Sequence, residues 1–126
     1  MLTTEPMTVV MEFISRINSG DVDRLCEIMA DDHVFQDALG KRFVGKETLR
    51  QGWKTFFAGT RDYKVHGENF FEAGELVAVF GTASGTSIRD GKFSKEGFWE
   101  VPAAWKAEIR GGLVAAWSVY AESSRP

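Results

Sequence analysis

The chain has a single cysteine, only three prolines and no run of lysine or arginine. Cys26 cannot form an internal disulfide, so nothing in the sequence indicates an oxidising compartment. The net charge of -3 disfavours a nucleic-acid partner, which would require a basic surface. No stretch approaches the roughly 20 apolar residues of a membrane span, and the N-terminus does not read as a signal peptide. We therefore expect a cytoplasmic protein with no nucleic-acid or membrane partner.

Aromatic residues, by contrast, are abundant, with 10 Phe, 4 Trp and 2 Tyr among the 126 residues. Such flat apolar side chains form the walls of either a core or a ligand pocket. A chain of this length is expected to form one domain, residues 1–126, with one sizeable core.

The first half of the chain is patterned for three helices. "NSG" at 18–20 supplies a stop for the first helix, and Asp21 is a good N-cap for a short second one. A third helix is expected from about Lys46 to near Gly59. The apolar positions recur at three- and four-residue spacing and are Met7, Val10, Phe13, Ile14 and Ile17, then Val22, Leu25, Ile28 and Met29, then Leu49, Trp53, Phe56 and Phe57.

The second half, from Tyr63 onward, is rich in β-branched and aromatic residues. Its segments are separated by "AG", "RDG" and "GG", which are typical of hairpin turns. Gly81 and Gly85 lie inside a strand pattern, where they indicate bulges and strong curvature. The sequence therefore predicts an α+β fold, with three N-terminal helices packed on a strongly curved antiparallel sheet.

The segment "VFQDALGKRFVG", residues 34–45, begins as a half-buried strand with alternating apolar and polar residues. The alternation places Asp37 on the same side as Phe35, the side that should face inward. One interpretation is a carboxylate that caps the turn before "ALG", as Asp often does. The other is a carboxylate in a pocket, and carboxylates near apolar walls are often functional.

Several segments resemble the NTF2-like superfamily, and within it the SnoaL-like polyketide cyclases and ketosteroid isomerases. They are "NSGD", "MADDHVFQD", "FVGKETL" and "VPAAWKAEIRGGLVAAWSVYAE", and the resemblance covers nearly the whole chain. It implies a conical α+β barrel, usually a homodimer, with an apolar pocket at its open end. It also aligns Asp37 with the aspartate that shuttles a proton in ketosteroid isomerases. A carboxyl group in a desolvated site has a raised pKa and can both accept and donate a proton.

The chain departs from the ketosteroid isomerases at their two oxyanion donors. Phe13 occupies the position of the tyrosine, and Trp105 falls near the position of the neutral acid. The loss of one such donor costs ~3 to 4 kcal/mol of transition-state stabilisation, which disfavours the usual isomerase mechanism. The SnoaL-like group fits the departure better, because its cyclases do acid–base chemistry on substrates that are already acidic.

The two histidines are weaker candidates. His66 faces solvent if Val65 faces the core, yet the near-neutral pKa of a histidine makes it the second catalytic candidate, after Asp37. His33 follows Asp31 and Asp32, and we interpret it as a solvated, charge-paired residue at the end of the second helix. Two histidines so far apart, without cysteine or glutamate at ligand spacing, do not predict a metal site. A proton transfer by Asp37 would need no cofactor.

The outward positions of the last two strands are partly apolar, which predicts that a second subunit covers the outer sheet face. Trp53 fits either the pocket or the core. The resulting hypothesis is an isomerase- or cyclase-like enzyme that binds a hydrophobic ligand as a homodimer. The alternatives are a non-catalytic binding protein and a dimeric assembly module. The predicted substrate-binding residues are Phe13, Ile17, Phe35, Trp53, Phe57, Trp105 and Tyr120.

Overall fold

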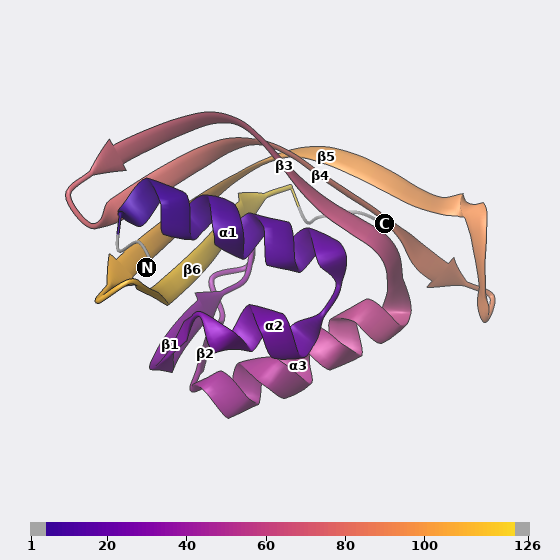
Figure 1. Cartoon of the computed structure of the whole chain (residues 1–126). Helices are drawn as coiled ribbons and strands as arrows, with labels where there is room; N and C mark the ends of the chain where they lie inside the picture. The colour runs from indigo at the N-terminus through magenta and orange to yellow at the C-terminus, as the bar shows by residue number, and fades with distance from the viewer. Residues whose placement is uncertain (1–4, 123–126) are drawn as a thin grey trace.

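In the computed structural model, which describes residues 5–122, helices cover one face of a six-stranded sheet (Figure 1). The α+β prediction is therefore confirmed. The elements in chain order are α1 (Pro6–Ser19), α2 (Val22–Glu27), β1 (Met29–Gln36), β2 (Arg42–Val44), α3 (Lys46–Gly59), β3 (Thr60–Ala73), β4 (Leu76–Arg89), β5 (Lys92–Arg110) and β6 (Leu113–Ala121).

The helix boundaries follow from local chemistry. Pro6 starts α1, where a missing N–H costs nothing, and Gly20 ends it in the left-handed conformation with φ 75°. The Asp21 side chain accepts a hydrogen bond from the Arg24 backbone N–H and so caps α2, as predicted. The predicted extension of α2 to Met29 is wrong, because the helix ends at Glu27 and Met29 begins β1.

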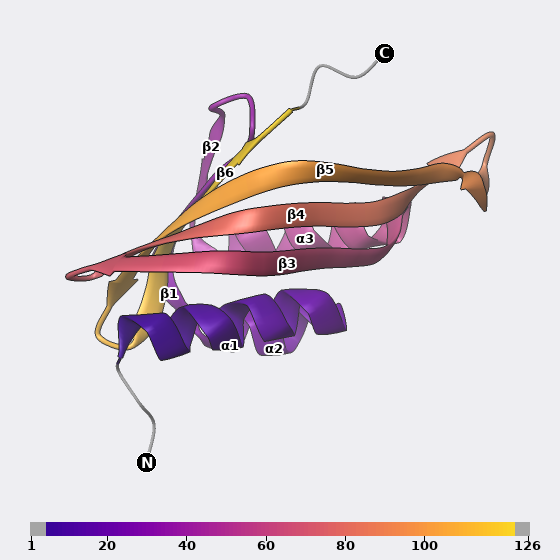
Figure 2. The same ribbon diagram turned by 90° about the horizontal axis from the view of Figure 1, so that it is seen from above.

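The sheet has the strand order β2-β1-β6-β5-β4-β3 and curls without closing. Its neighbouring strands are antiparallel, as predicted, except that β1 and β6 run parallel. The long strands β3, β4 and β5 lie side by side over the helices (Figure 2).

Of the two glycines predicted to lie inside a strand, Gly81 and Gly85, the first is explained by the close approach of the β3 backbone. A Cβ at Gly81 would lie 1.8 Å from the His66 carbonyl oxygen, so only glycine fits there. The register shift beside it lies on β3, between Gly67 and Asn69. Gly85 pairs with Trp99 in regular register.

The core lies between α1 and the concave face of the sheet. On β5 more buried residues alternate with more exposed ones from Trp99 to Arg110, and Trp105 stacks on Trp117 of β6 with 6.3 Å between ring centroids. Phe13 of α1 packs on Trp117 at 5.0 Å. Among residues 5–122 no helix has the length and apolar character to cross a bilayer. A cytoplasmic location stays a prediction.

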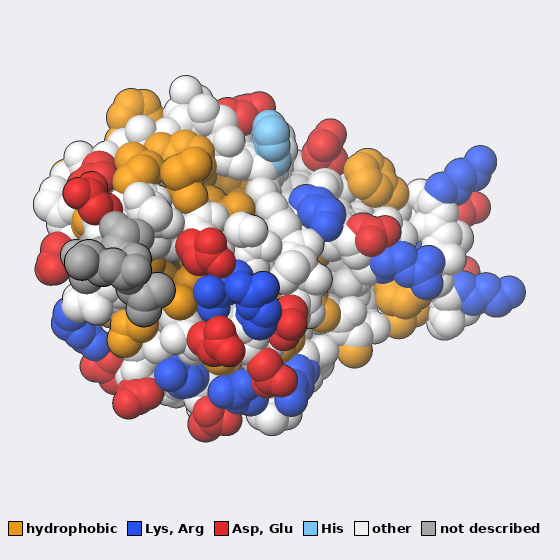
Figure 3. Space-filling model, viewed as in Figure 1, with side chains coloured by type: hydrophobic (Ala, Val, Ile, Leu, Met, Phe, Trp, Pro, Cys, Tyr) orange, Lys and Arg blue, Asp and Glu red, His pale blue; other side chains and the backbone are white. Residues whose placement is uncertain are grey.

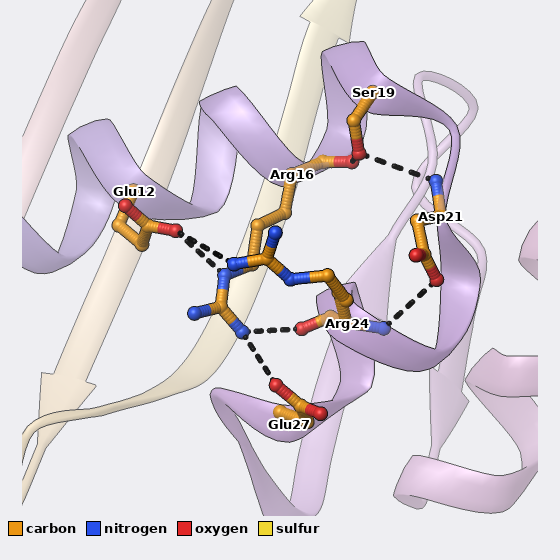
Figure 4. A network of polar contacts seen from close by, with 6 residues as sticks. All are labelled: Glu12, Arg16, Ser19, Asp21, Arg24 and Glu27. Carbon is orange, nitrogen blue, oxygen red and sulfur yellow. Dashed lines mark hydrogen bonds and ion pairs between the residues drawn. The ribbon is translucent and has the colours of Figure 1, made fainter.

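The opposite side of α1 and α2 is charged. Figure 3 shows acidic and basic side chains interspersed over the front of the molecule. Figure 4 shows one such network, in which Arg16 donates to Glu12 at 2.7 Å and to Glu27 at 3.1 Å. Arg16 also donates to the Arg24 carbonyl at 2.6 Å, which ties the two helices together. These contacts lie at the surface, so they add little to stability.

Candidate functional site

A cavity of about 910 Å³ lies between α3 and the concave face of the sheet. This volume is within the range of small-molecule sites, which are mostly apolar with a few polar groups. Its walls come from α3, the β1–β2 connection and the cavity-facing parts of β3, β4, β5 and β6. Strands distant in sequence thus meet a single helix around one hollow.

Aromatic rings form a continuous wall of this cavity. Phe35 of β1 contacts Phe43 of β2 at 6.3 Å and Trp53 of α3 at 6.0 Å between centroids. Trp53 in turn lies 6.4 Å from Tyr63 of β3, and Tyr63 lies 6.0 Å from Trp99 of β5. The cavity therefore suits a flat apolar or aromatic ligand.

The sequence of α3 explains why this helix presents the wall. Leu49, Trp53 and Phe56 recur at four- and three-residue spacing, so they share one helix face. Gly52 lies among them in the lining and leaves space where any side chain would project.

Asp37 follows β1 directly and lines the cavity with Phe35. The carboxylate oxygen Oδ1 accepts hydrogen bonds from the backbone N–H groups of Leu39 and Lys41, each at 2.9 Å. The Asp37 N–H donates to the Lys41 carbonyl at 2.9 Å. Asp37 therefore both caps the β1–β2 turn and lines the cavity. The two interpretations drawn from the sequence, a turn cap and a pocket carboxylate, are compatible. Oδ2 takes part in neither turn bond.

The other polar groups at the cavity are concentrated on β3, β4 and β5. They are Tyr63, Ser87, Arg89 and Glu100, with Thr48 on α3 and Glu122 beyond β6. Trp99 Nε1 donates to Ser87 Oγ at 3.0 Å, which leaves the serine proton available to another acceptor. Burial raises the pKa of Tyr63 to about 12, so its hydroxyl stays protonated at neutral pH. Among residues 5–122 no three His, Cys, Asp or Glu side chains are grouped to share a metal ion.

A family model describing the SnoaL-like domain matches residues 10–117. The chain belongs to this SnoaL-like family. No curated protein matches it. Among solved structures, the SnoaL-like protein is similar to a proposed SnoaL-like polyketide cyclase from Shewanella denitrificans, with 14% identity, a TM-score of 0.83, and coverage of 93% of this chain and 90% of that one.

Two further structures have the same fold. The epoxide hydrolase/cyclase-like enzyme SalBIII, described in pyran ring formation in the polyether salinomycin, is 18% identical, with a TM-score of 0.82. The match covers 97% of this chain and 96% of SalBIII. IdmH, a proposed polyketide cyclase from Streptomyces antibioticus, is 20% identical, with a TM-score of 0.78, and the match covers 94% of this chain and 92% of IdmH. At these identities the likeness shows the fold alone.

The structure brings only some of the residues predicted from the sequence to the cavity. Asp37, Phe35 and Trp53 line it. The predicted wall residues Phe13, Ile17 and Trp105 are instead buried in the core between α1 and the sheet and do not line the cavity. Phe57 packs on Trp53 at 5.3 Å without lining the cavity.

The remaining two predicted residues of the SnoaL-like protein lie outside. Tyr120 is 46% exposed, on the outward side of β6. His66 is exposed on β3, opposite Thr82, and does not line the cavity. Tyr63 was not predicted from the sequence, although one observation indicated it. It lies two residues before Val65, which was taken to face the core, so the two side chains share one face of the strand.

The interpretation of His33 as a solvated residue at a helix end is wrong. The side chain is fully buried on β1, with Nδ1 at 2.7 Å from the Val114 carbonyl oxygen of β6. Nε2 has no hydrogen-bond partner among the described residues. Burial lowers the pKa of His33 below 6.5, and the Val114 hydrogen bond and the charge of Asp32 oppose this shift. The neutral His33 ring therefore links the paired strands β1 and β6, which together are called the β1–β6 joint.

Proposed function

We propose that the SnoaL-like protein is an acid–base enzyme of the cyclase or isomerase type that acts on an apolar or aromatic carbonyl compound. The observation that carries this proposal is the position of Asp37, a carboxylate that lines the cavity beside its aromatic wall. The fold likeness to IdmH and SalBIII supports the same class of chemistry.

In the proposed step, Asp37 takes a proton from a carbon next to the substrate carbonyl. The electron pair of the C–H bond moves into an enolate, and the protonated carboxyl group then returns the proton to another atom of the substrate. Oδ2 is the oxygen suited to this exchange, because Oδ1 is held by the turn. The aromatic wall orients the substrate beside the carboxylate. The step needs no cofactor.

The test uses β-tetralone, an aromatic ketone with acidic C–H bonds beside its carbonyl. We expect the wild-type protein to accelerate exchange of these protons with deuterated water, as followed by NMR, with a rate that depends on pH. Asp37→Asn should abolish the acceleration, while its side-chain oxygen can still accept the turn N–H groups and preserve the fold. Asp31→Asn, at an exposed position of β1, is the matched control and should keep the activity. An unchanged rate in Asp37→Asn would remove Asp37 from the mechanism.

A second candidate function is binding without catalysis. It is favoured by the two backbone hydrogen bonds to Asp37 Oδ1, which give the carboxylate a structural role in the turn. In that case β-tetralone binds, its protons exchange no faster than in buffer, and Asp37→Asn changes neither observation.

We further propose that the protein forms a homodimer through the outer face of the sheet. The helices cover only the concave face (Figure 1), while Phe71 and Phe80 pack together on the exposed outer side at 5.9 Å between centroids. An exposed aromatic pair of this kind is typical of an interface. Sedimentation should give a dimer for the wild type and a monomer for Phe80→Glu. A monomeric wild type would contradict the proposal and leave the third candidate role, a dimeric assembly module, without support.

A further inference from the structure

Tyr63 is held in the cavity wall by aromatic rings from two elements. Phe56 of α3 meets its ring edge-on at 4.9 Å and 89°, and Trp53 lies at 6.4 Å. Trp99 of β5 lies on a further side at 6.0 Å. A ring fixed by three neighbours points its hydroxyl group in a defined direction, which is what specific recognition of a ligand atom requires.

A backbone irregularity sets the direction of this side chain. The pairing of β3 with β4 shifts between Arg61 and Lys64, so three steps on β3 match two steps on β4. Asp62 takes the extra step with φ 55°, a conformation that residues with a side chain seldom adopt. As a result Thr60 and Tyr63 both lie on the inner side, although regular alternation would put them on opposite faces. Bulges that redirect a side chain are common beside functional sites.

The hydroxyl group of Tyr63 has no hydrogen-bond partner among residues 5–122, although most of the side chain is buried. The nearby indole N–H of Trp99, in contrast, is satisfied by Ser87. A hydroxyl in an apolar wall lowers the free energy of a complex when a ligand atom accepts its proton. The high pKa keeps this group a donor over the whole physiological range.

We propose that the Tyr63 hydroxyl donates a hydrogen bond to the carbonyl or enolate oxygen of the ligand, and so selects aromatic ketones over hydrocarbons of the same shape. The proposal rests on the proposed function, because it requires the cavity to bind an aromatic ligand. It assigns Tyr63 the donor role that Phe13 and Trp105 do not fill, since both are buried in the core away from the cavity.

The experiment compares two ligands and two tyrosine variants by calorimetry. The ligands are β-tetralone and its methylene analogue, in which C=CH₂ replaces C=O without changing the ring system. Tyr63→Phe should weaken binding of β-tetralone about 3- to 10-fold, the effect of one hydrogen bond, and leave the affinity for the analogue unchanged. Tyr120→Phe, which removes the hydroxyl of the exposed tyrosine, is the control and should alter neither affinity.

A second readout excludes a purely structural role for the ring. The carbonyl stretching frequency of bound β-tetralone should be lower in the wild type than in Tyr63→Phe, because a donor weakens the C=O bond. Equal loss of affinity for both ligands, or an unchanged frequency, would overturn the assignment while leaving the proposed function intact. If the wild type binds neither ligand, the proposed function fails together with it.

Discussion

Replacement of His33 by leucine tests whether this residue is a buried neutral group at the β1–β6 joint. The variant keeps a side chain of similar size and removes the Nδ1 donor to the Val114 carbonyl. A buried carbonyl without a partner costs about 1 to 3 kcal/mol. The loss of the unpartnered Nε2 atom offsets part of this. We therefore expect the free energy of unfolding near neutral pH to fall by about 1 to 2 kcal/mol.

The pH dependence is the sharper part of this prediction. The pKa of His33 is lowered in the folded state, so the unfolded chain binds more protons once the pH falls below the ordinary value of 6.5. The stability contributed by His33 is fully present above that value and is lost as the pH falls towards the folded pKa. As the pH falls below 6.5 the wild type should lose stability through this residue, and His33→Leu should lose none of it.

Urea unfolding at several pH values measures both effects, because the transition gives the free energy directly. His66→Asn, which removes the chain's other, exposed histidine, is the matched control for the loss of a histidine. If His33→Leu and the wild type lose the same stability on acidification, the ring is not held neutral and the placement of His33 is refuted.

Three further predictions concern the sheet, the cavity and the surface. Gly81→Ala should destabilise the fold by about 2 to 3 kcal/mol in urea unfolding, because its Cβ would meet a β3 carbonyl, while Gly52→Ala on α3 should not destabilise it. In Tyr120→Phe the remaining phenol, Tyr63, should ionise near pH 12 in an absorbance titration. The stability that the folded protein gains from the protonated Tyr63 should be fully present below pH 10 and should be lost as the pH rises through 12. Ionisation near 10 would place the hydroxyl in water. Arg16→Met should cost less than about 1 kcal/mol, and less still in high salt, since its partners are two surface carboxylates and the exposed Arg24 carbonyl. A larger cost would show that this network is structural.

Much of the fold was predictable because its helices and long strands follow simple periodicities. The predicted bounds of α3 agree with the structure, and the alternation of apolar and polar residues along β5 matches its buried and exposed positions. Ile28 and Met29 were ambiguous, because apolar neighbours fit the end of a helix and the start of a buried strand equally well. The acidic pair before His33 suggested a helix end, whereas the pairing of β1 with β6 shifts between Met29 and Val34 and buries the histidine.

The candidate site was only partly predictable, because it depends on register shifts and on which inward residues meet the core. Alternation was enough to place Asp37 with Phe35. It could not separate Phe13 and Trp105, which face the packed core, from Trp53, which faces the cavity, since all three are inward aromatics. The bulge at Asp62 leaves no mark in composition, so only coordinates could show that Thr60 and Tyr63 lie on the same side of β3.

The central claim, that the hollow between α3 and the sheet binds an aromatic ketone, is tested most directly by filling it. Gly52→Phe adds a ring to the cavity wall at a helical position where a Cβ meets no atom within 4 Å. Gly59→Phe, at the end of the same helix and outside the lining, is the control. Calorimetry should give an affinity for β-tetralone at least ~10-fold weaker in Gly52→Phe than in the control, with both variants folded. Equal affinities would mean that the ligand binds elsewhere.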